Sequence, residues 1–404
     1  MSHATTTQSP LKPPSRWRQH FTLDLPPAQK KRCIWVHACS MGEVASIIPL
    51  IEYLLERNHS IHLTVVTHTG MALAQKHFHK RIGISFLPWD LPFLPNRLIR
   101  RIQPQLLLLT ETEFWPRMLK NCQRRNIPII GINTRISDRS FPRYLATRYI
   151  WKHWLKPVQL FLAQSAQDAE RLTTIGIDPE KIRTLGNLKY VLEAPNIDVA
   201  ALRKRIDPSQ TRPLLLLASS HEGEESAILN MITSWKSIVP NLLLIIAPRH
   251  PERFDRVGSL IEQQGYTLSQ WSNEIDLGHY PDVFLLDAMG VLRQLFTIAD
   301  VAIIGGSLLP IGGHNPLEAA ICGRGVITGP YVENFREIMQ TMQKKQAAIV
   351  CNSQEELQQC VQQLLAHPDT LQTLHGNAVL MMQPQHHLLD DYYNEIQPFI
   401  QSTH

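Results

Sequence analysis

The sequence predicts an α/β protein with two doubly wound domains, each built on a parallel sheet. Short apolar runs alternate with longer amphipathic segments, as in consecutive βαβ units. The alternation stops in a stretch rich in Pro and charged residues, residues 190–212, and then begins again. We therefore expect a first domain over residues 1–190 and a second over residues 191–404.

In the first domain, short runs of apolar residues predict strands, and helical spacing of apolar residues predicts helices. The expected strands are 34–39, 61–67, 84–87, 106–110, 127–132 and 158–163, and the expected helices are 43–57, 71–80, 114–125 and 166–175.

The same pattern returns in the second domain. The expected strands are 214–218, 242–247, 283–286 and 301–304, and the expected helices are 224–238, 253–264 and 291–298. Because ligands of such sheets bind beyond the carboxyl ends of the strands, we expect the functional site in a cleft between the domains.

A glycine-rich loop follows the strand at 301–304 and contains Gly305, Gly306, Gly312 and Gly313. After it, Asn315 fits a helix N-cap, Pro316 the first helical position, and Glu318 the first turn. Such a helix start suits a phosphate, and a carboxylate one turn in can accept hydrogen bonds from ribose hydroxyls. The alternative is an ordinary capped helix after a glycine turn. Four glycines in one loop favour the phosphate, since glycine is destabilising unless backbone must come close to something.

The charge is divided unequally between the two halves. The net charge is +5, but residues 1–190 hold 27 Lys and Arg against 12 Asp and Glu, whereas residues 191–404 hold 13 against 23. Such asymmetry indicates domains that face different partners, and the basic half should favour an anionic surface or substrate.

The composition argues against a membrane-spanning, a secreted or a metal-binding protein. A hydrophobic fraction of 44% with 19% charged residues is typical of a soluble globular protein, and no run approaches the roughly 20 apolar residues of a membrane-spanning helix. The polar start, residues 1–14, is not a secretory signal. The six cysteines form no CxxC pair and there is no HExxH motif, so we expect free thiols, a reducing compartment and no metal site.

Several strand ends carry residues suited to catalysis. Glu43 follows the first strand and opens a helix, where the positive dipole end should lower the pKa of its carboxyl group and leave it ionised to accept a proton. The alternative is that Glu43 only stabilises that dipole. Glu111 and Glu113 follow the strand at 106–110 and either bind a polar acceptor or form an acidic helix turn.

The second domain offers candidate nucleotide contacts at its own strand ends. Arg249 lies between two prolines in a turn that suits a single phosphate. The turn 287–290 also offers backbone N–H groups, but by itself it is weak evidence for a nucleotide contact. The polar stretch 219–225 could contact the nucleotide or could equally be a helix-capping sequence.

One segment combines basic and interfacial aromatic residues. In residues 141–156, Arg148, Trp151 and Lys152 belong to a pattern that is typical of an anionic-lipid face, and Arg97, Arg100 and Arg101 form a neighbouring basic group. The alternative is a half-buried helix with solvated charges. No nucleic-acid recognition motif accompanies the charge, so we expect no nucleic-acid partner.

Taken together, the motifs resemble those of the 3-deoxy-D-manno-octulosonic acid (Kdo) transferase family of lipopolysaccharide synthesis. The resemblance extends from about residue 16 to the end of the chain. The matching motifs are HACSMGEV (37–44), ETEFWP (111–116), NTRIS (133–137), GNLKY (186–190), SSHEGEE (219–225), APRHPERF (247–254), GGS (305–307), GGHNPLEAA (312–320) and GPYVENF (329–335).

This resemblance implies the GT-B glycosyltransferase fold, with a C-terminal helix that returns to the N-terminal domain. It implies inverting transfer of Kdo from CMP-Kdo to a lipid A precursor (lipid IVA), with no metal and no cofactor. The first domain would bind the acceptor and the second CMP-Kdo. The catalytic base falls on Glu43 and supporting positions on Glu113 and Lys189. The CMP contacts fall on Pro248, Arg249, Met289, Gly290, Val291, Asn315, Pro316, Leu317 and Glu318.

Three departures from the family pattern accompany the resemblance. Val291 stands where the family has an acidic residue, so that nucleotide contact is expected through backbone or lost, and Val191 stands where an Asp usually follows the Lys–aromatic pair. Relatives commonly begin with an apolar anchor helix, whereas here a polar tail precedes Arg16. Either a native anchor segment is missing from this sequence, or the protein is held at the membrane by its basic, aromatic face alone. We expect a peripheral protein on the cytoplasmic face of the inner membrane, bound to the anionic membrane surface. The alternatives are another GT-B enzyme, a UDP-sugar transferase or epimerase, and a non-catalytic nucleotide-binding module.

Overall fold

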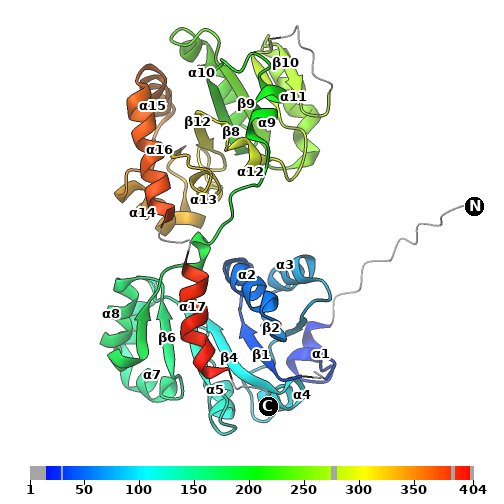
Figure 1. The fold of residues 1–404 in the computed structure, drawn as a ribbon, viewed down its shortest axis with the longest axis vertical. Coiled ribbons are helices and arrows are strands. Elements are labelled where there is room, and N and C mark those ends of the chain that lie inside the picture. Colours follow the sequence, from blue (N-terminus) through cyan, green and yellow to red (C-terminus); the bar gives the residue numbers. More distant parts are fainter. Residues whose placement is uncertain (1–14, 29–30, 274–279, 384–386, 401–404) are drawn as a thin grey trace, which may run out of the picture. The chain divides into compact units, whose positions relative to one another are not determined.

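The computed structural model describes residues 15–28, 31–273, 280–383 and 387–400, and within these ranges it contains two parallel sheets of seven strands each. The chain forms two compact units, unit 1 (Met1–Val191 with Gln385–His404) and unit 2 (Leu192–Pro384). The predicted fold class, two doubly wound α/β sheets, is confirmed (Figure 1).

Unit 1 has the strand order β3-β2-β1-β4-β5-β6-β7. Every residue of β1, β2, β4, β5 and β6 is buried, as expected for parallel strands covered on both faces. The strands are β1 (Cys33–His37), β2 (Ile61–Val65), β3 (Gly83–Phe86), β4 (Pro104–Thr110), β5 (Ile129–Thr134), β6 (Leu160–Ala163) and β7 (Ile182–Thr184). The helices are α1 (Arg16–His20), α2 (Met41–Glu56), α3 (His68–Phe78), α4 (Leu94–Ile102), α5 (Pro116–Gln123), α6 (Phe141–Ala146), α7 (Arg148–Leu155), α8 (Ala166–Thr174), the short η1 (Pro179–Lys181) and η2 (Leu188–Tyr190), and α17 (Leu388–Ile396), followed by η6 (Gln397–Phe399).

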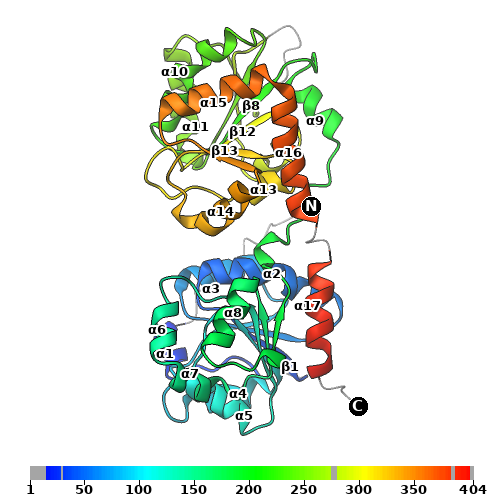
Figure 2. The ribbon, with the colours of Figure 1, turned by 90° about the vertical axis from the view of Figure 1, so that its left-hand side faces the viewer.

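Two hydrophobic clusters lie on opposite faces of this sheet. Side chains of α2, α3 and α17 cover the face that carries Ile34 and Val36, and those of α4, α5, α7 and α8 cover the face that carries Trp35. Figure 2 shows these helices around the unit 1 sheet. The alternation along β1 is the period-two pattern of a strand between two helical layers.

The C-terminal helix α17 packs in unit 1 rather than in the unit that precedes it. Tyr392 is fully buried and its hydroxyl donates to the Gly186 carbonyl at 2.9 Å. Leu388 and Ile396 join the same core cluster as the apolar face of α2, and Figure 1 shows α17 in red beside the unit 1 sheet. The return of this helix to unit 1 agrees with the expected GT-B architecture.

Unit 2 repeats the plan with the order β10-β11-β9-β8-β12-β13-β14. Its strands are β8 (Leu214–Ser220), β9 (Leu243–Pro248), β10 (Leu268–Gln270), β11 (Val283–Leu285), β12 (Val301–Ile304), β13 (Val326–Thr328) and β14 (Ala348–Val350). Its helices are α9 (Val199–Ile206), α10 (Glu224–Lys236), η3 (Pro251–Arg253), α11 (Phe254–Gln263), α12 (Leu292–Leu295), α13 (Leu317–Ala320), η4 (Glu333–Phe335), α14 (Arg336–Lys344), α15 (Gln354–Ala366) and α16 (Pro368–Met382).

Some predicted elements differ from the observed ones. The basic and aromatic segment 141–156 is two helices, α6 and α7, which meet at Thr147. The helix expected at 291–298 is the single turn α12. Strands β7, β10, β13 and β14 have three residues each, too few to show a periodic pattern, and the sequence did not predict them.

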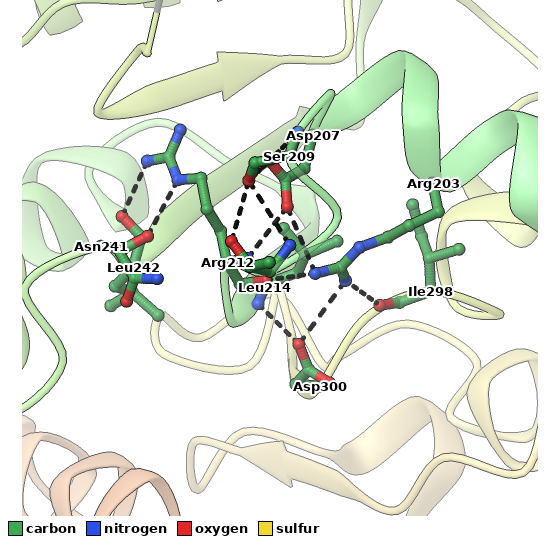
Figure 3. A network of polar contacts seen from close by, with 10 residues as sticks. Arg203, Asp207, Ser209, Arg212, Leu214, Asn241, Leu242, Ile298 and Asp300 are labelled. Carbon is green, nitrogen blue, oxygen red and sulfur yellow. Dashed lines mark hydrogen bonds and ion pairs between the residues drawn. The ribbon is translucent and has the colours of Figure 1, made fainter.

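A buried network of charges fixes the start of the unit 2 sheet (Figure 3). The Asp207 carboxylate is fully buried, lies 3.5 Å from the Arg203 guanidinium and accepts from the Arg212 backbone N–H at 2.9 Å. The Arg212 side chain donates to the carbonyls of Asn241, Leu242 and Pro281. Asp300 accepts from the Leu214 N–H at 2.7 Å and so joins β8 to this network.

Asp207→Ala should lower the free energy of unfolding by about 3 kcal/mol, because it leaves the Arg203 charge and the Arg212 N–H without their buried partner. Urea unfolding measures the change. Asp255→Ala on α11, an exposed position, is the control and should change stability by less than about 0.5 kcal/mol. Equal effects of the two variants would show that the network is not stabilising.

Candidate active site

In unit 1, the turn from β1 into α2 positions the Glu43 carboxylate. The Ser40 side chain caps α2 by accepting from the Glu43 N–H, and its hydroxyl donates to Glu43 Oε1 at 2.9 Å. The Cys39 N–H donates to Glu43 Oε2 at 2.8 Å. The arrangement is a variant of the capping box in which Cys39, before the N-cap, supplies the backbone N–H, so Glu43 does stabilise the helix start while its carboxylate stays at the carboxyl end of β1.

Glu113, which follows the end of β4, lies close to Glu43. The Cys39 sulfur and one carboxylate oxygen each of Glu43 and Glu113 lie within 4.8 Å of one another. Glu111, between β4 and Glu113, has a φ of 54°, a left-handed conformation that is rare outside glycine. Such strained residues are frequent at functional sites. The structure therefore brings the predicted Glu43 and Glu113 together.

The prediction that the pKa of Glu43 is lowered is wrong. Burial raises the pKa of the Glu43 carboxyl to about 7, the charges of Glu113 and Glu111 add to the increase, and the Cys39 N–H and Ser40 hydroxyl oppose it only in part. Burial also raises the pKa of Glu113. Desolvation outweighs the helix dipole because the carboxylate is largely removed from water.

The third predicted residue, Lys189, contacts Glu111 rather than Glu113. Its Nζ lies 3.5 Å from Glu111 Oε1. The fully buried Asn133 holds the segment, because its side-chain oxygen accepts from the Leu188 N–H at 2.9 Å. Glu111 was not among the residues predicted to be catalytic, and its signal in the sequence was the Thr-Glu-Thr-Glu pattern at the end of the strand.

In unit 2, a pocket of about 500 Å³ lies at the carboxyl ends of the strands. Six of the predicted CMP contacts line it, whereas Val291, Pro316 and Leu317 do not. Leu317 is fully buried in the core. The predicted residues on the pocket wall are Pro248, Arg249, Met289, Gly290, Asn315 and Glu318.

The pocket also contains an arginine that was not among the predicted nucleotide contacts. Arg293 lines it from α12, beside Arg249 and Glu318. Burial raises the pKa of Glu318, and the positive charges of Arg293 and Arg249 oppose that increase. The pocket therefore combines two guanidinium groups with one carboxylate. Arg293 comes three residues after Gly290 in a strand-end turn, which was the only available signal.

The helix after the glycine-rich loop is shorter than predicted and begins later. It is α13, with four residues, and Pro316 rather than Asn315 occupies its N-cap position. The Asn315 side chain accepts from the Leu317 N–H at 3.1 Å and so satisfies one of the backbone groups expected to bind phosphate. One helical turn has little macrodipole, so charge in this pocket comes mainly from the arginines.

The glycines of this loop have a structural reason of their own. A Cβ at Gly305 would lie 2.5 Å from the Ser219 carbonyl oxygen, and Gly312 and Gly313 have positive φ angles. The buried Glu224 accepts from the N–H groups of Gly306 and Leu308, which fixes the loop against the start of α10. His314, on the pocket wall, lies 2.8 Å from His221 between their Nε2 atoms, and burial lowers the pKa of His314 to about 4.

The residues predicted to form a basic, aromatic membrane face differ in their exposure to solvent. Arg148 and Lys152 are exposed, but Trp151 is half-buried and packs on the core of unit 1, so the indole that faces outward is that of Trp154. Arg97, Arg100 and Arg101 are exposed, and Arg101 also donates to the Pro26 carbonyl at 2.7 Å. Within the described ranges, none of the helices combines the length and apolar character needed to cross a bilayer.

Arg100 lies far from the carboxylates of unit 1. It lines a second pocket, of about 430 Å³, together with Arg32 and Arg125. Arg32 directly precedes β1 and Pro104, another wall residue, begins β4. The strands are parallel, so this pocket is at the opposite edge of the sheet from Glu43 and Glu113.

The two parallel sheets and their strand orders define the GT-B fold. A solved structure, a glycosyltransferase from Rickettsia africae, shares the fold with a TM-score of 0.54 and 16% identity, covering 93% of this chain and 100% of that one.

Comparison with known sequences identifies the protein family within this fold. The family model "3-Deoxy-D-manno-octulosonic-acid transferase (kdotransferase)" matches residues 15–192. The chain is 35% identical to 3-deoxy-D-manno-octulosonic acid transferase of Haemophilus influenzae over 371 residues, covering 90% of this chain and 85% of the relative. It is 30% identical to the enzyme of that name from Bordetella pertussis, covering 86% and 83%. The chain belongs to the Kdo transferase family and is a glycosyltransferase.

Proposed function

We propose that this protein transfers Kdo from CMP-Kdo to a hydroxyl of a lipid A precursor, lipid IVA, with inversion at the anomeric carbon. The observation that carries the proposal is the Glu43 carboxyl group, whose pKa of about 7 at the end of β1 suits a general base at neutral pH. In the reaction, ionised Glu43 accepts the proton of the acceptor hydroxyl. The oxygen then bonds to the anomeric carbon of Kdo while CMP leaves with the electrons of the broken bond.

The unit 2 pocket is proposed to bind the donor. Its volume is within the usual range for small-molecule sites. Arg249 and Arg293 supply two positive charges for the single phosphate of CMP, and Glu318 accepts hydrogen bonds from ribose hydroxyls. Charge neutralisation by guanidinium groups is a reason to expect transfer without a metal ion.

Lys189, Glu111 and Glu113 are proposed to act as charged supports for the same reaction. Lys189, 3.5 Å from Glu111, offers a positive charge to the Kdo carboxylate or to the transition state. Glu113 orients the reacting hydroxyl, since its carboxylate oxygen lies within 4.8 Å of that of Glu43.

The rate should depend on pH through Glu43. A base with a raised pKa is protonated and inactive at low pH, so kcat/KM should rise with pH and reach half its plateau near pH 7, where the pKa of Glu43 lies. Glu113, Glu111 and, through Glu111, Lys189 are the charged groups around it. Measurement of kcat/KM between pH 5 and 9 with a chelator present checks this. A profile that is flat through this range would contradict the role of Glu43.

We further propose that the basic unit 1 meets the anionic cytoplasmic face of the inner membrane, where the acceptor resides. Tyr149, Ile150 and Trp154 of α7 are 76%, 48% and 40% exposed, beside the exposed Arg148 and Lys152. Outward aromatic and basic side chains on one helix are suited to a headgroup region.

The double variant Arg148→Glu/Lys152→Glu should weaken binding to vesicles with anionic lipid by at least about tenfold, since each basic residue near such a surface contributes about 1 kcal/mol. Vesicle co-sedimentation measures it. Lys204→Glu/Arg256→Glu, a matched charge reversal at exposed positions of unit 2, is the control. If both pairs behave alike, net charge rather than the α7 face determines binding.

The direct test is CMP release from CMP-Kdo with and without the tetra-acylated lipid A precursor, with mass spectrometry of the lipid. Acceptor-dependent release and lipid heavier by one or more Kdo residues are expected. No transfer by folded protein, with preferential binding of a uridine nucleotide, would favour another GT-B activity, such as a UDP-sugar transferase or epimerase.

A further inference from the structure

The cluster of Cys39, Glu43 and Glu113 has the composition and the spacing of a cation site. Among the described residues it is a group of three potential ligands, a thiol and two carboxylates, whose donor atoms all lie within 4.8 Å of one another. Zinc bonds of about 2.3 Å to sulfur and about 2.0–2.2 Å to oxygen place ligand atoms roughly 3.5 Å apart. Rotation of these side chains by about 1 Å would therefore be enough to surround one ion.

An independent feature of the structure points to a ligand at the same place. His37 is fully buried, and its Nε2 has no hydrogen-bond partner. This atom lies 4.0 Å from Glu113 Oε2. The other ring nitrogen, Nδ1, lies 3.1 Å from the Thr64 carbonyl, which can only accept, and 3.0 Å from the Thr64 hydroxyl, which can also donate. In the tautomer in which Nδ1 donates to the carbonyl, Nε2 presents a lone pair to the Glu113 carboxylate, and the two require a positively charged group or a proton between them.

The surroundings favour a cation and hold its ligands in place. The Cys39 N–H and the Ser40 hydroxyl both donate to Glu43, and the Thr64 carbonyl fixes the His37 ring. Hydrogen bonds of this kind orient metal ligands. Glu111 adds a third carboxylate, and Lys189 is paired with it. A thiolate beside carboxylates and an imidazole selects Zn²⁺ or Cd²⁺ over Mg²⁺ or Ca²⁺.

We propose that Cys39, Glu43 and Glu113, with Nε2 of His37 beside them, form a binding site for a thiophilic divalent cation such as Zn²⁺, and that the bound cation inhibits the enzyme. On binding, a metal–sulfur bond replaces the thiol S–H bond of Cys39 and the proton leaves to solvent. The ion also occupies the Glu43 oxygen that would accept the acceptor's proton. Binding is independent of the proposed function, whereas inhibition rests on Glu43 as the base.

Cadmium titration followed by the ultraviolet thiolate-to-metal absorption tests the binding. Cys351 and Cys360 are hydrogen-bonded to each other in unit 2 and form the pair of thiols that would compete most strongly for Cd²⁺. The titration therefore uses the Cys360→Ser protein. This protein should bind one Cd²⁺ with the thiolate band. Adding Cys39→Ser should remove the band and weaken binding at least about tenfold, whereas adding Cys322→Ser, at another partly buried cysteine, should change neither. A missing band, or an equal band with Cys39→Ser, would overturn the site.

Glu113→Gln supplies a second check that does not alter a thiol. It removes a carboxylate ligand, so it should weaken Cd²⁺ binding by at least about tenfold while the band at saturation remains. Unchanged affinity would overturn the role of Glu113 as a ligand.

Inhibition is measured separately, as Kdo transfer against Zn²⁺ concentration. The parent protein should lose activity and recover it on addition of a chelator, and Cys39→Ser should raise the half-inhibiting concentration at least about tenfold relative to its own zinc-free rate. Tight binding through Cys39 without loss of transfer would leave the site standing and overturn both the inhibition and Glu43 as the base.

Discussion

Replacing Glu43 by glutamine should lower kcat for Kdo transfer by about 100- to 10,000-fold, the usual contribution of a general base. The amide has nearly the shape of the carboxyl group but cannot accept the acceptor's proton. It can still receive the Cys39 N–H through its oxygen, so α2 should keep its cap and the protein its fold. Steady-state rates with CMP-Kdo and lipid acceptor, alongside the thermal unfolding midpoint, measure the two effects.

The matched control is Glu56→Gln, at an exposed position near the other end of α2. It removes the same charge from the same helix and should leave kcat within about twofold, since it contacts no reacting group. Transfer by Glu43→Gln at the parent rate would exclude Glu43 as the base. Loss of activity together with unfolding would instead assign it a structural role in the cap.

Arg249→Met should weaken CMP binding by about 10- to 100-fold, the usual loss when a charged hydrogen-bond donor to an anion is removed. Arg249 lines the unit 2 pocket, and methionine keeps part of the side-chain length without the charge. Arg293 remains and supplies part of the attraction, so binding should weaken rather than vanish. Isothermal titration of CMP into the purified protein measures the change.

Arg256→Met is the comparison for this experiment. Arg256 is 70% exposed, pairs with Glu222 and lies outside the pocket wall, so CMP affinity should be unchanged. If both variants bind CMP as tightly as the parent, the pocket is not the phosphate site. If both lose affinity equally, the effect comes from the overall charge of unit 2.

The parts of the fold that the sequence predicted are those whose signal is local. Strand β4 is seven buried residues in a row, and α2 repeats apolar side chains with helical spacing. Strands β13 and β14, of three residues each, were not predicted and are defined by their partners in the sheet, whereas the equally short β11 was predicted from the apolar run 283–286. The break between α6 and α7 at Thr147 was likewise not predicted, and both helices place side chains on the same core cluster.

The candidate site was predicted in position but not in its electrostatics. Strand-end motifs located Glu43, Glu113 and Arg249 because parallel strands present their carboxyl ends at one edge. The direction of the Glu43 pKa shift could not be derived in the same way. It depends on the burial of the carboxylate and on the charges of Glu111 and Glu113, which come close to Glu43 only in three dimensions. The outward position of Trp154 rather than Trp151 depends on the same kind of packing.

The return of α17 has a consequence for how the chain is made. Unit 2 is continuous in sequence, whereas the core of unit 1 includes Leu388, Tyr392 and Ile396. During synthesis from the N-terminus, the ribosome must therefore add more than half of the chain before the last side chains of the first-made core emerge. Domains generally fold as units while the chain grows. Unit 1 therefore cannot complete its core, and part of the apolar surface of α2 stays uncovered, until the segment that follows unit 2 has been made.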